Sequence, residues 1–150
     1  SLLRLLEVGL KAPVLADGLQ AIIGQRLVRK LCLHCRKAMS ELSEHADLEM
    51  AQELLESECE LKAEELYLPM GCDKCSGGFK GRVAVHEFLP MTGKLAKQLT
   101  KEACYEALME AAKEDGFKTY WQDGLRLLSS GLTSPGEIVR SLSSYLMPPQ

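Results

Sequence analysis

The amino-acid sequence predicts an α+β fold, and three observations lead to that prediction. Residues 81–89 begin at a glycine, end before a proline and are rich in β-branched and aromatic side chains, as a β-strand is. Residues 92–146 carry apolar side chains at the three- and four-residue spacing of amphipathic helices. Two Cys-x-x-Cys pairs stand far apart in the chain and can close a loop around a metal ion; they are Cys32 with Cys35 and Cys72 with Cys75.

The composition is that of a globular protein: of 150 residues, 46% are hydrophobic and 26% are charged. The net charge of −3 gives no general attraction to nucleic acid, and no apolar run approaches the roughly 20 residues that span a bilayer. We therefore expect neither nucleic-acid binding nor direct membrane insertion. The chain opens on Ser1 and continues at once in a leucine-rich helical pattern, which indicates a piece of a longer protein.

The segment before the first cysteine pair predicts two helices and a strand. Residues 1–10 have the pattern of the end of an amphipathic helix, and residues 13–24 that of a second helix. The apolar stripe of the second helix is Leu15, Leu19, Ile22 and Ile23. Residues 25–31 alternate in polarity and suit a strand or a helix running into one, and we favour the strand. Since residues 25–31 and 81–89 adjoin the two cysteine pairs, joining the pairs would align these segments as antiparallel strands.

Between the cysteine pairs, residues 41–65 are strongly acidic, with Lys62 as their one basic residue. Apolar residues at helical spacing predict a short helix over about residues 46–58. The acidic residues would then form a solvated helix face, and a docking surface for a basic partner is the alternative. Near residues 67–71 a short extended segment returns the chain to the second cysteine pair.

Everything after Pro90 predicts helices, over residues 92–99, 101–115, 118–130 and from Ser134 onward. The last has the strongest start signal, because Ser134 suits the N-cap, Pro135 the first turn and Glu137 the reciprocal position of a capping box. The stripes of these helices predict the core of one small helical subdomain. Their members include Tyr105, Leu108, Met109, Ala112, Trp121, Leu125, Leu128, Ile138, Val139, Leu142 and Leu146.

Four cysteine thiolates can surround one Zn²⁺ ion as a tetrahedron, at about 2.3 Å per bond. An iron–sulfur cluster and unligated or redox-active thiols are the open alternatives. Disulfides are disfavoured, because nothing resembles a secretory signal and reduced thiols are normal in the cytosol. Cys59 and Cys104 stand alone, and we expect them to be small buried or half-buried residues.

Catalytic motifs are missing from the sequence, which has no phosphate loop, dinucleotide fingerprint, zinc-protease motif or nucleophile elbow. Gly77 and Gly78 follow the second cysteine pair, where we expect their backbone N–H groups to bond cysteine sulfur. Arg26, Arg29 and Arg82 lie on the predicted strands. They are either ordinary ion-pair partners or contacts to a nucleotide phosphate or a neighbouring subunit.

Several motifs together resemble one protein family. They occupy residues 19–35, 71–87, 110–116, 123–125 and 131–138. In this combination they resemble the C-terminal region of the hexameric secretion ATPases, in the branch that carries a tetracysteine zinc module and serves type II secretion or type IV pilus assembly. The likeness covers nearly the whole chain except residues 40–66. Leu33 departs from it, because many members have proline after the first cysteine.

The resemblance implies a cytoplasmic motor, peripheral to the bacterial inner membrane, that uses ATP and Mg²⁺ as a homohexamer and contacts inner-membrane platform proteins. The catalytic boxes of such motors lie upstream, so this fragment alone should not hydrolyse ATP. Residues 1–31 would be the tail of the RecA-like core and 76–91 its return strand. Residues 32–75 would be the zinc insertion and 92–147 the C-terminal helical subdomain. The competing hypothesis is a zinc-stabilised protein-interaction or nucleic-acid adaptor with no ATPase attached.

Overall fold

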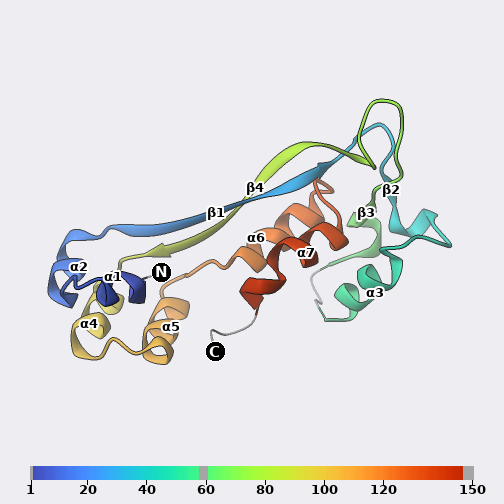
Figure 1. The fold of residues 1–150 in the computed structure, drawn as a ribbon. Coiled ribbons are helices and arrows are strands. Elements are labelled where there is room, and N and C mark those ends of the chain that lie inside the picture. The colour runs from blue at the N-terminus through green and yellow to red at the C-terminus, as the bar shows by residue number, and fades with distance from the viewer. Residues whose placement is uncertain (1, 58–60, 147–150) are drawn as a thin grey trace. The chain divides into compact units, whose positions relative to one another are not determined.

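The structure of the chain, a computed structural model, describes residues 2–57 and 61–146 and confirms the α+β class (Figure 1). Its elements, in chain order, are α1 (Leu2–Glu7), α2 (Ala12–Gly18), β1 (Ala21–Leu31), β2 (Lys37–Ala38), η1 (Met39–Glu41), α3 (Leu48–Ser57), η2 (Ala63–Glu65), β3 (Tyr67–Leu68), β4 (Phe79–Pro90), α4 (Gly93–Lys101), α5 (Tyr105–Glu114), α6 (Tyr120–Ser129) and α7 (Pro135–Leu146).

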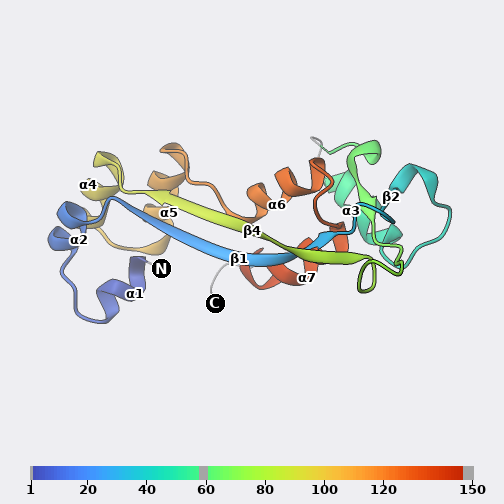
Figure 2. The same ribbon diagram turned by 90° about the horizontal axis from the view of Figure 1, so that it is seen from above.

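The strands β1 and β4 form a two-stranded sheet and run in opposite directions in both views (Figures 1 and 2). The antiparallel pairing predicted for residues 25–31 and 81–89 is therefore confirmed. The helix predicted over residues 13–24 is wrong beyond Gly18, because β1 already begins at Ala21. β-Branched Ile22 and Ile23 favour the pleated strand, and Ile23 is 67% exposed instead of lying on a buried stripe.

A first compact unit comprises Ser1–Gln25 and His86–Thr119. Its helices α1, α2, α4 and α5 enclose a core of Leu2, Leu15, Leu95, Leu99, Leu108, Ala111 and Ala112. Thr92 caps α4, because its hydroxyl oxygen accepts a hydrogen bond from the Leu95 amide at 3.2 Å. The helix predicted from residue 101 starts later than expected: Lys101 ends α4, and α5 begins at Tyr105, whose side chain is exposed.

A second compact unit comprises Arg26–Val85 and Tyr120–Gln150, and it contains both cysteine pairs. Strands β2 and β3 pair antiparallel within it, with Lys37 opposite Leu68 and Ala38 opposite Tyr67. Helices α6 and α7 pack together beside α3 (Figure 1). The buried core consists of Val28, Met39, Ala51, Leu54, Leu61, Leu66, Leu68, Val85, Tyr120, Leu127, Leu128, Ile138 and Leu142.

The acidic segment folds as predicted around α3. Ala51 and Leu54 of this helix are buried in the core of the second unit. Glu49, Glu53 and Glu56 are exposed, so the acidic side of the helix is a solvated face. No helix within residues 2–57 and 61–146 combines the length and the apolar character needed to cross a membrane.

The core of the second unit predicts a strong effect for Leu142→Ala. Leu142 is fully buried on α7, so truncation removes buried apolar surface and leaves a cavity. We expect a loss of about 2–5 kcal/mol in the free energy of unfolding, measured by chemical denaturation. Leu33→Ala is the control, because Leu33 is 64% exposed, and it should change stability by less than about 0.5 kcal/mol. Equal losses in the two variants would contradict this assignment of the core.

Candidate metal centre

Each cysteine pair forms the same tight turn. The backbone N–H of Cys35 donates to the carbonyl oxygen of Cys32 at 3.3 Å, and Cys75 bonds Cys72 in the same way at 3.3 Å. The Cys32 amide in turn donates to the carbonyl oxygen of Gly78 at 2.9 Å. This last hydrogen bond joins the two turns where β1 ends and β4 begins. The strand pairing thus delivers both pairs of sulfurs to one place.

The four sulfur atoms of the cysteine pairs lie within 4.8 Å of one another. Three separations are 3.9 Å for Cys32 to Cys72, 3.7 Å for Cys35 to Cys75 and 3.6 Å for Cys72 to Cys75. A tetrahedron with bonds of about 2.3 Å has sulfur separations of about 3.8 Å, whereas a disulfide bond is about 2.05 Å long. The predicted set is therefore brought together as free thiols, in a geometry that can hold a metal ion.

The thiols of the centre differ in acidity. Burial raises the pKa of the Cys75 thiol, but hydrogen bonds from the backbone amides of Cys72 and Gly78 and from neighbouring thiols outweigh it and lower the pKa to about 7. Burial raises the pKa of Cys35 to about 12. Near neutral pH Cys75 can thus offer a thiolate to an incoming cation, and binding would displace the protons of thiols that are still protonated. The hydrogen bond from the backbone N–H of Gly78 to the sulfur of Cys75 matches the role expected for that glycine.

Gly78 is also required for steric reasons. Its φ of +86° lies in the left-handed region, and a Cβ atom there would come 2.4 Å from the Cβ of Pro69. A side chain at this position would push the second cysteine turn away from the segment that precedes it. The second cysteine turn thus explains Gly78 without phosphate binding.

The remaining sequence candidates take separate positions. Cys104 is half-buried immediately before α5, as expected, and Cys59 lies outside the described residues. Arg26 and Arg82 are exposed on β1 and β4. Arg29 instead engages a carboxylate, as the ion-pair alternative proposed. Contacts of these arginines with nucleotide or a neighbouring subunit stay a prediction.

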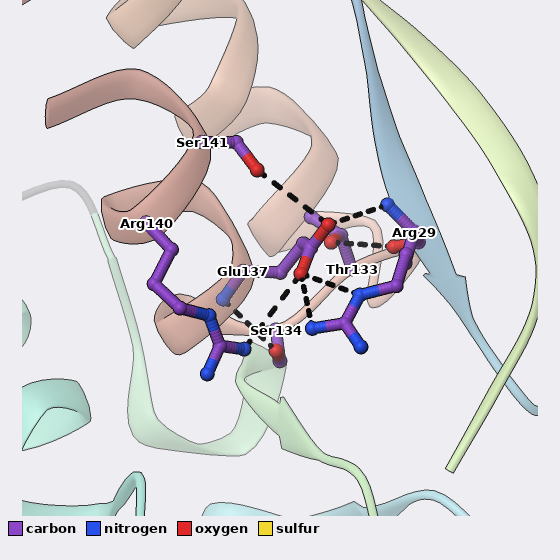
Figure 3. Close-up of polar contacts among 6 residues, drawn as sticks. All are labelled: Arg29, Thr133, Ser134, Glu137, Arg140 and Ser141. Atoms are coloured by element: carbon purple, nitrogen blue, oxygen red, sulfur yellow. Dashed lines mark hydrogen bonds and ion pairs between the residues drawn. The ribbon is translucent and has the colours of Figure 1, made fainter. Parts of the chain in front are cut away.

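Arg29 binds Glu137 of α7 through its backbone and its side chain (Figure 3). The Arg29 amide donates to Oε1 of Glu137 at 2.8 Å, while Nε and Nη2 approach Oε2 at 2.8 Å and 2.6 Å. Arg140 lies 3.7 Å from the same oxygen, and Ser141 donates to Oε1 at 3.5 Å. The Glu137 side chain is only 7% exposed, so this carboxylate is buried and fully engaged.

The predicted capping box is only half present. The Ser134 hydroxyl accepts a hydrogen bond from the Glu137 amide at 3.3 Å, as an N-cap does. The Glu137 carboxylate, however, faces Arg29 instead of returning to the start of its own helix. A buried carboxylate gains more from a charged guanidinium than from a neutral amide, which explains the difference. Sequence reasoning missed this partner because 108 residues separate the two side chains.

The turn between α6 and α7 lies along the end of β1. Leu31 donates its amide hydrogen to the carbonyl oxygen of Leu132 at 2.9 Å, and the Thr133 hydroxyl donates to the carbonyl oxygen of Arg29 at 2.9 Å. Thr133 and Ser134 are fully buried. This turn therefore continues the hydrogen bonding of β1 immediately before the first cysteine.

The ion pair shifts the pKa values of both Arg29 and Glu137. Burial raises the pKa of Glu137, but hydrogen bonds and charge from Arg29, together with the charge of Arg140, lower it below the ordinary value for glutamate. The Arg29 pKa is raised above its ordinary value, chiefly by the side-chain hydrogen bond to Glu137. Both groups therefore stay charged over the whole neutral range.

Comparison with known proteins places the chain among secretion components. The model of the family described as "Type II/IV secretion system protein" matches residues 1–140. The type IV pilus assembly ATPase PilB of Pseudomonas aeruginosa is 37% identical over 144 residues, which cover 93% of this chain and 24% of that protein. The protein transport protein HofB homolog of Escherichia coli is 32% identical over 142 residues, which cover 95% of this chain and 29% of that protein.

A third relative is the type II secretion system protein E of Aeromonas hydrophila, which is 30% identical over 91% of this chain and 26% of its own length. The chain thus spans about a quarter of the length of each of these three relatives.

The Arg29–Glu137 pair predicts that Arg29→Leu destabilises the second unit. The substitution leaves a buried carboxylate without its main partner, and Arg140 is too far away to replace every bond. We expect a loss of about 1–3 kcal/mol in the free energy of unfolding, measured by urea denaturation. The control Arg4→Leu removes an exposed ion pair with Glu7 and should cost less than about 0.5 kcal/mol. A loss for Arg29→Leu no larger than that of the control would refute the anchoring role.

The lowered pKa of Glu137 predicts an acid-sensitive contribution to stability. A carboxyl group whose pKa is lower in the folded state stabilises the fold above its unfolded pKa, and this stabilisation disappears as the pH falls through the folded value. The stability difference between the wild type and Glu137→Gln should therefore be largest near pH 7 and shrink below about pH 4.3. Denaturation at a series of pH values measures it, and a difference that stays constant down to pH 3 would contradict the prediction.

Proposed function

Because the chain belongs to the type II/IV secretion system protein family, we propose that it is the zinc-binding C-terminal part of a motor ATPase that powers type II secretion or type IV pilus assembly. The observation that carries this proposal is the tetrahedral spacing of four cysteine sulfurs inside a segment that the family matches over residues 1–140.

Zinc is the metal that this ligand set fits best. Four thiolates from two Cys-x-x-Cys turns form a closed structural site, with no position left for water or substrate. Zinc would supply no redox chemistry here and would act by holding Cys32, Cys35, Cys72 and Cys75 together. Glycine amides next to the sulfurs, as at Gly78, support bound thiolates.

The role assigned to this part of the motor is structural and coupling, not catalytic. The printed sequence contains no phosphate loop, so ATP and Mg²⁺ would be bound by other parts of the protein. We assign residues 1–31 to the tail of the RecA-like core, 32–75 to the zinc insertion and 76–91 to the return strand. Residues 92–147 would form the C-terminal helical region, in which α4 and α5 belong to the first compact unit and α6 and α7 to the second instead of sharing one core.

The proposed surroundings follow from the relatives, whose names describe pilus assembly ATPases and type II secretion proteins. We propose that the parent protein works in the cytoplasm against the bacterial inner membrane, as a homohexamer docked on membrane platform proteins. Arg26 and Arg82 are exposed and are candidates for contact with a neighbouring subunit or its nucleotide.

Elemental analysis of the purified chain tests the metal part of the proposal. We expect one zinc per chain, and a chelator should release the metal and expose four thiols together. The double variant Cys32→Ser/Cys72→Ser should bind no zinc. The control Cys104→Ser should keep the full metal content, because Cys104 lies outside the sulfur cluster.

A chain that contains no metal and has freely reactive thiols at all four positions would refute zinc binding. The motor assignment is tested separately, because the reading frame that encodes this chain must also encode a phosphate loop upstream. An upstream sequence without one would favour the zinc-stabilised adaptor instead.

A further inference from the structure

The side chain of Arg36 extends from the first cysteine turn to the turn between α6 and α7. Its guanidinium carbon lies 4.3 Å from the centre of the Tyr67 ring, and its Nη1 donates to the carbonyl oxygen of Gly131. Arg36 is half-buried and forms no ion pair with any residue of the described ranges. The guanidinium of Arg36 therefore contacts the face of the Tyr67 ring and a backbone carbonyl instead of a carboxylate.

The backbone of Gly131 is shaped to receive this side chain. Its φ is +65°, which favours glycine, and a Cβ atom there would lie 2.8 Å from the Tyr67 ring and 2.9 Å from Nη1 of Arg36. Gly131 also closes the turn that follows α6, because its amide donates a hydrogen bond to the carbonyl oxygen of Leu128 at 2.8 Å. The guanidinium thus occupies the space that a side chain at this position would fill.

The other end of Arg36 is fixed by the cysteine site. Its backbone N–H donates to the carbonyl oxygen of Cys32 at 3.0 Å, within the turn that presents Cys32 and Cys35. Tyr67 belongs to β3, which pairs with β2 directly after Arg36 and leads toward the second cysteine pair. A metal ion that holds the four sulfurs would therefore also set the positions of Arg36 and of the Tyr67 ring that its guanidinium contacts.

From Gly131 the contacts continue into α7. Leu132 and Thr133 bond to the end of β1, Ser134 caps α7, and Glu137 binds Arg29. Residues 131–137 are thus held at their start by the first cysteine turn and at their end by the strand that leads into it.

We propose that Arg36 couples metal binding at the four cysteines to the order of residues 131–137 and of α7. Metal binding stabilises this segment through Arg36, and the segment in turn strengthens metal binding, because coupling between two sites is reciprocal. The inference rests on the metal binding in the proposed function and is independent of the motor assignment. Arginine suits the role because its planar guanidinium can stack and donate hydrogen bonds at once, which a lysine ammonium cannot.

The test uses the whole chain and compares Arg36→Met, Arg36→Lys and the control Lys37→Met. Lys37 is the next residue along the chain, is exposed and carries the same charge. Zinc affinity is measured by competition with a chromophoric chelator, and hydrogen exchange of residues 131–142 is followed with zinc and after its removal. We expect Arg36→Met to bind zinc roughly tenfold more weakly and to lose the zinc-dependent protection of residues 131–142. Lys37→Met should match the wild type in both measurements.

Arg36→Lys separates coupling from simple charge attraction to the thiolates. If charge alone mattered, the lysine variant would behave as the wild type, and this result would overturn the proposal. It would also be overturned if Arg36→Met kept wild-type zinc affinity and zinc-dependent protection. Tyr67→Leu tests the same contact without altering any charge and should reproduce the loss of coupling.

The outcomes also separate this inference from the proposed function. A wild-type chain that binds no zinc would refute zinc binding and the coupling with it. A wild-type chain that binds zinc, with Arg36 variants that leave exchange in residues 131–142 unchanged, would refute the coupling alone.

Discussion

The meeting of the two cysteine turns is the constraint on which the second unit depends. Forty positions along the chain separate Cys32 from Cys72, and closing a loop of this length costs conformational entropy that local contacts alone repay slowly. Strands β1 and β4 lead to the turns from one side, and the short pair β2–β3 leads to them from the other. The four sulfurs therefore lie at the junction of two antiparallel ribbons. A metal ion bound by these sulfurs would fix the register of both ribbons at once.

The buried carboxylate of Glu137 addresses a different problem, which is where α7 begins relative to β1. An ion pair whose carboxylate is buried adds little stability compared with an apolar substitute, but the carboxylate tolerates few alternative partners. Glu137 accepts a hydrogen bond from the Arg29 backbone amide, and its Oε2 also contacts Nε and Nη2 of the Arg29 side chain. A shift of the helix by one residue would break all three contacts. The ion pair is therefore better suited to specifying one packing arrangement than to strengthening it.

The sequence predicts the parts of this architecture that local chemistry determines. Spacing alone predicted the four cysteines as one cluster, and composition predicted the core portion of β4. The pairing of β4 with β1 was predicted because both segments adjoin the cysteine pairs. The end of α2 could not be predicted in this way, because Ile22 and Ile23 fit a helical stripe as well as a strand, and only the presence of β4 decides between them. The partner of Glu137 could not be predicted either, because a local pattern and a distant contact compete there as well. Ser134, Pro135 and Glu137 are compatible with a local capping box, and the competing contact comes from Arg29, 108 residues away.

Arg29 precedes the first cysteine turn in the chain and Arg36 follows it, and each contacts one end of residues 131–137. Their contacts differ in kind. Arg29 satisfies a buried charge, so losing it is costly and leaves Glu137 to weaker partners. Arg36 meets a neutral carbonyl and an aromatic ring, so its contact can open at smaller cost. Movement of the cysteine turn would consequently release Gly131 before it releases Glu137. The turn that follows α6 can then loosen while the start of α7 stays attached to β1. A change at the cysteines would therefore first alter the end of this segment that lies at Gly131.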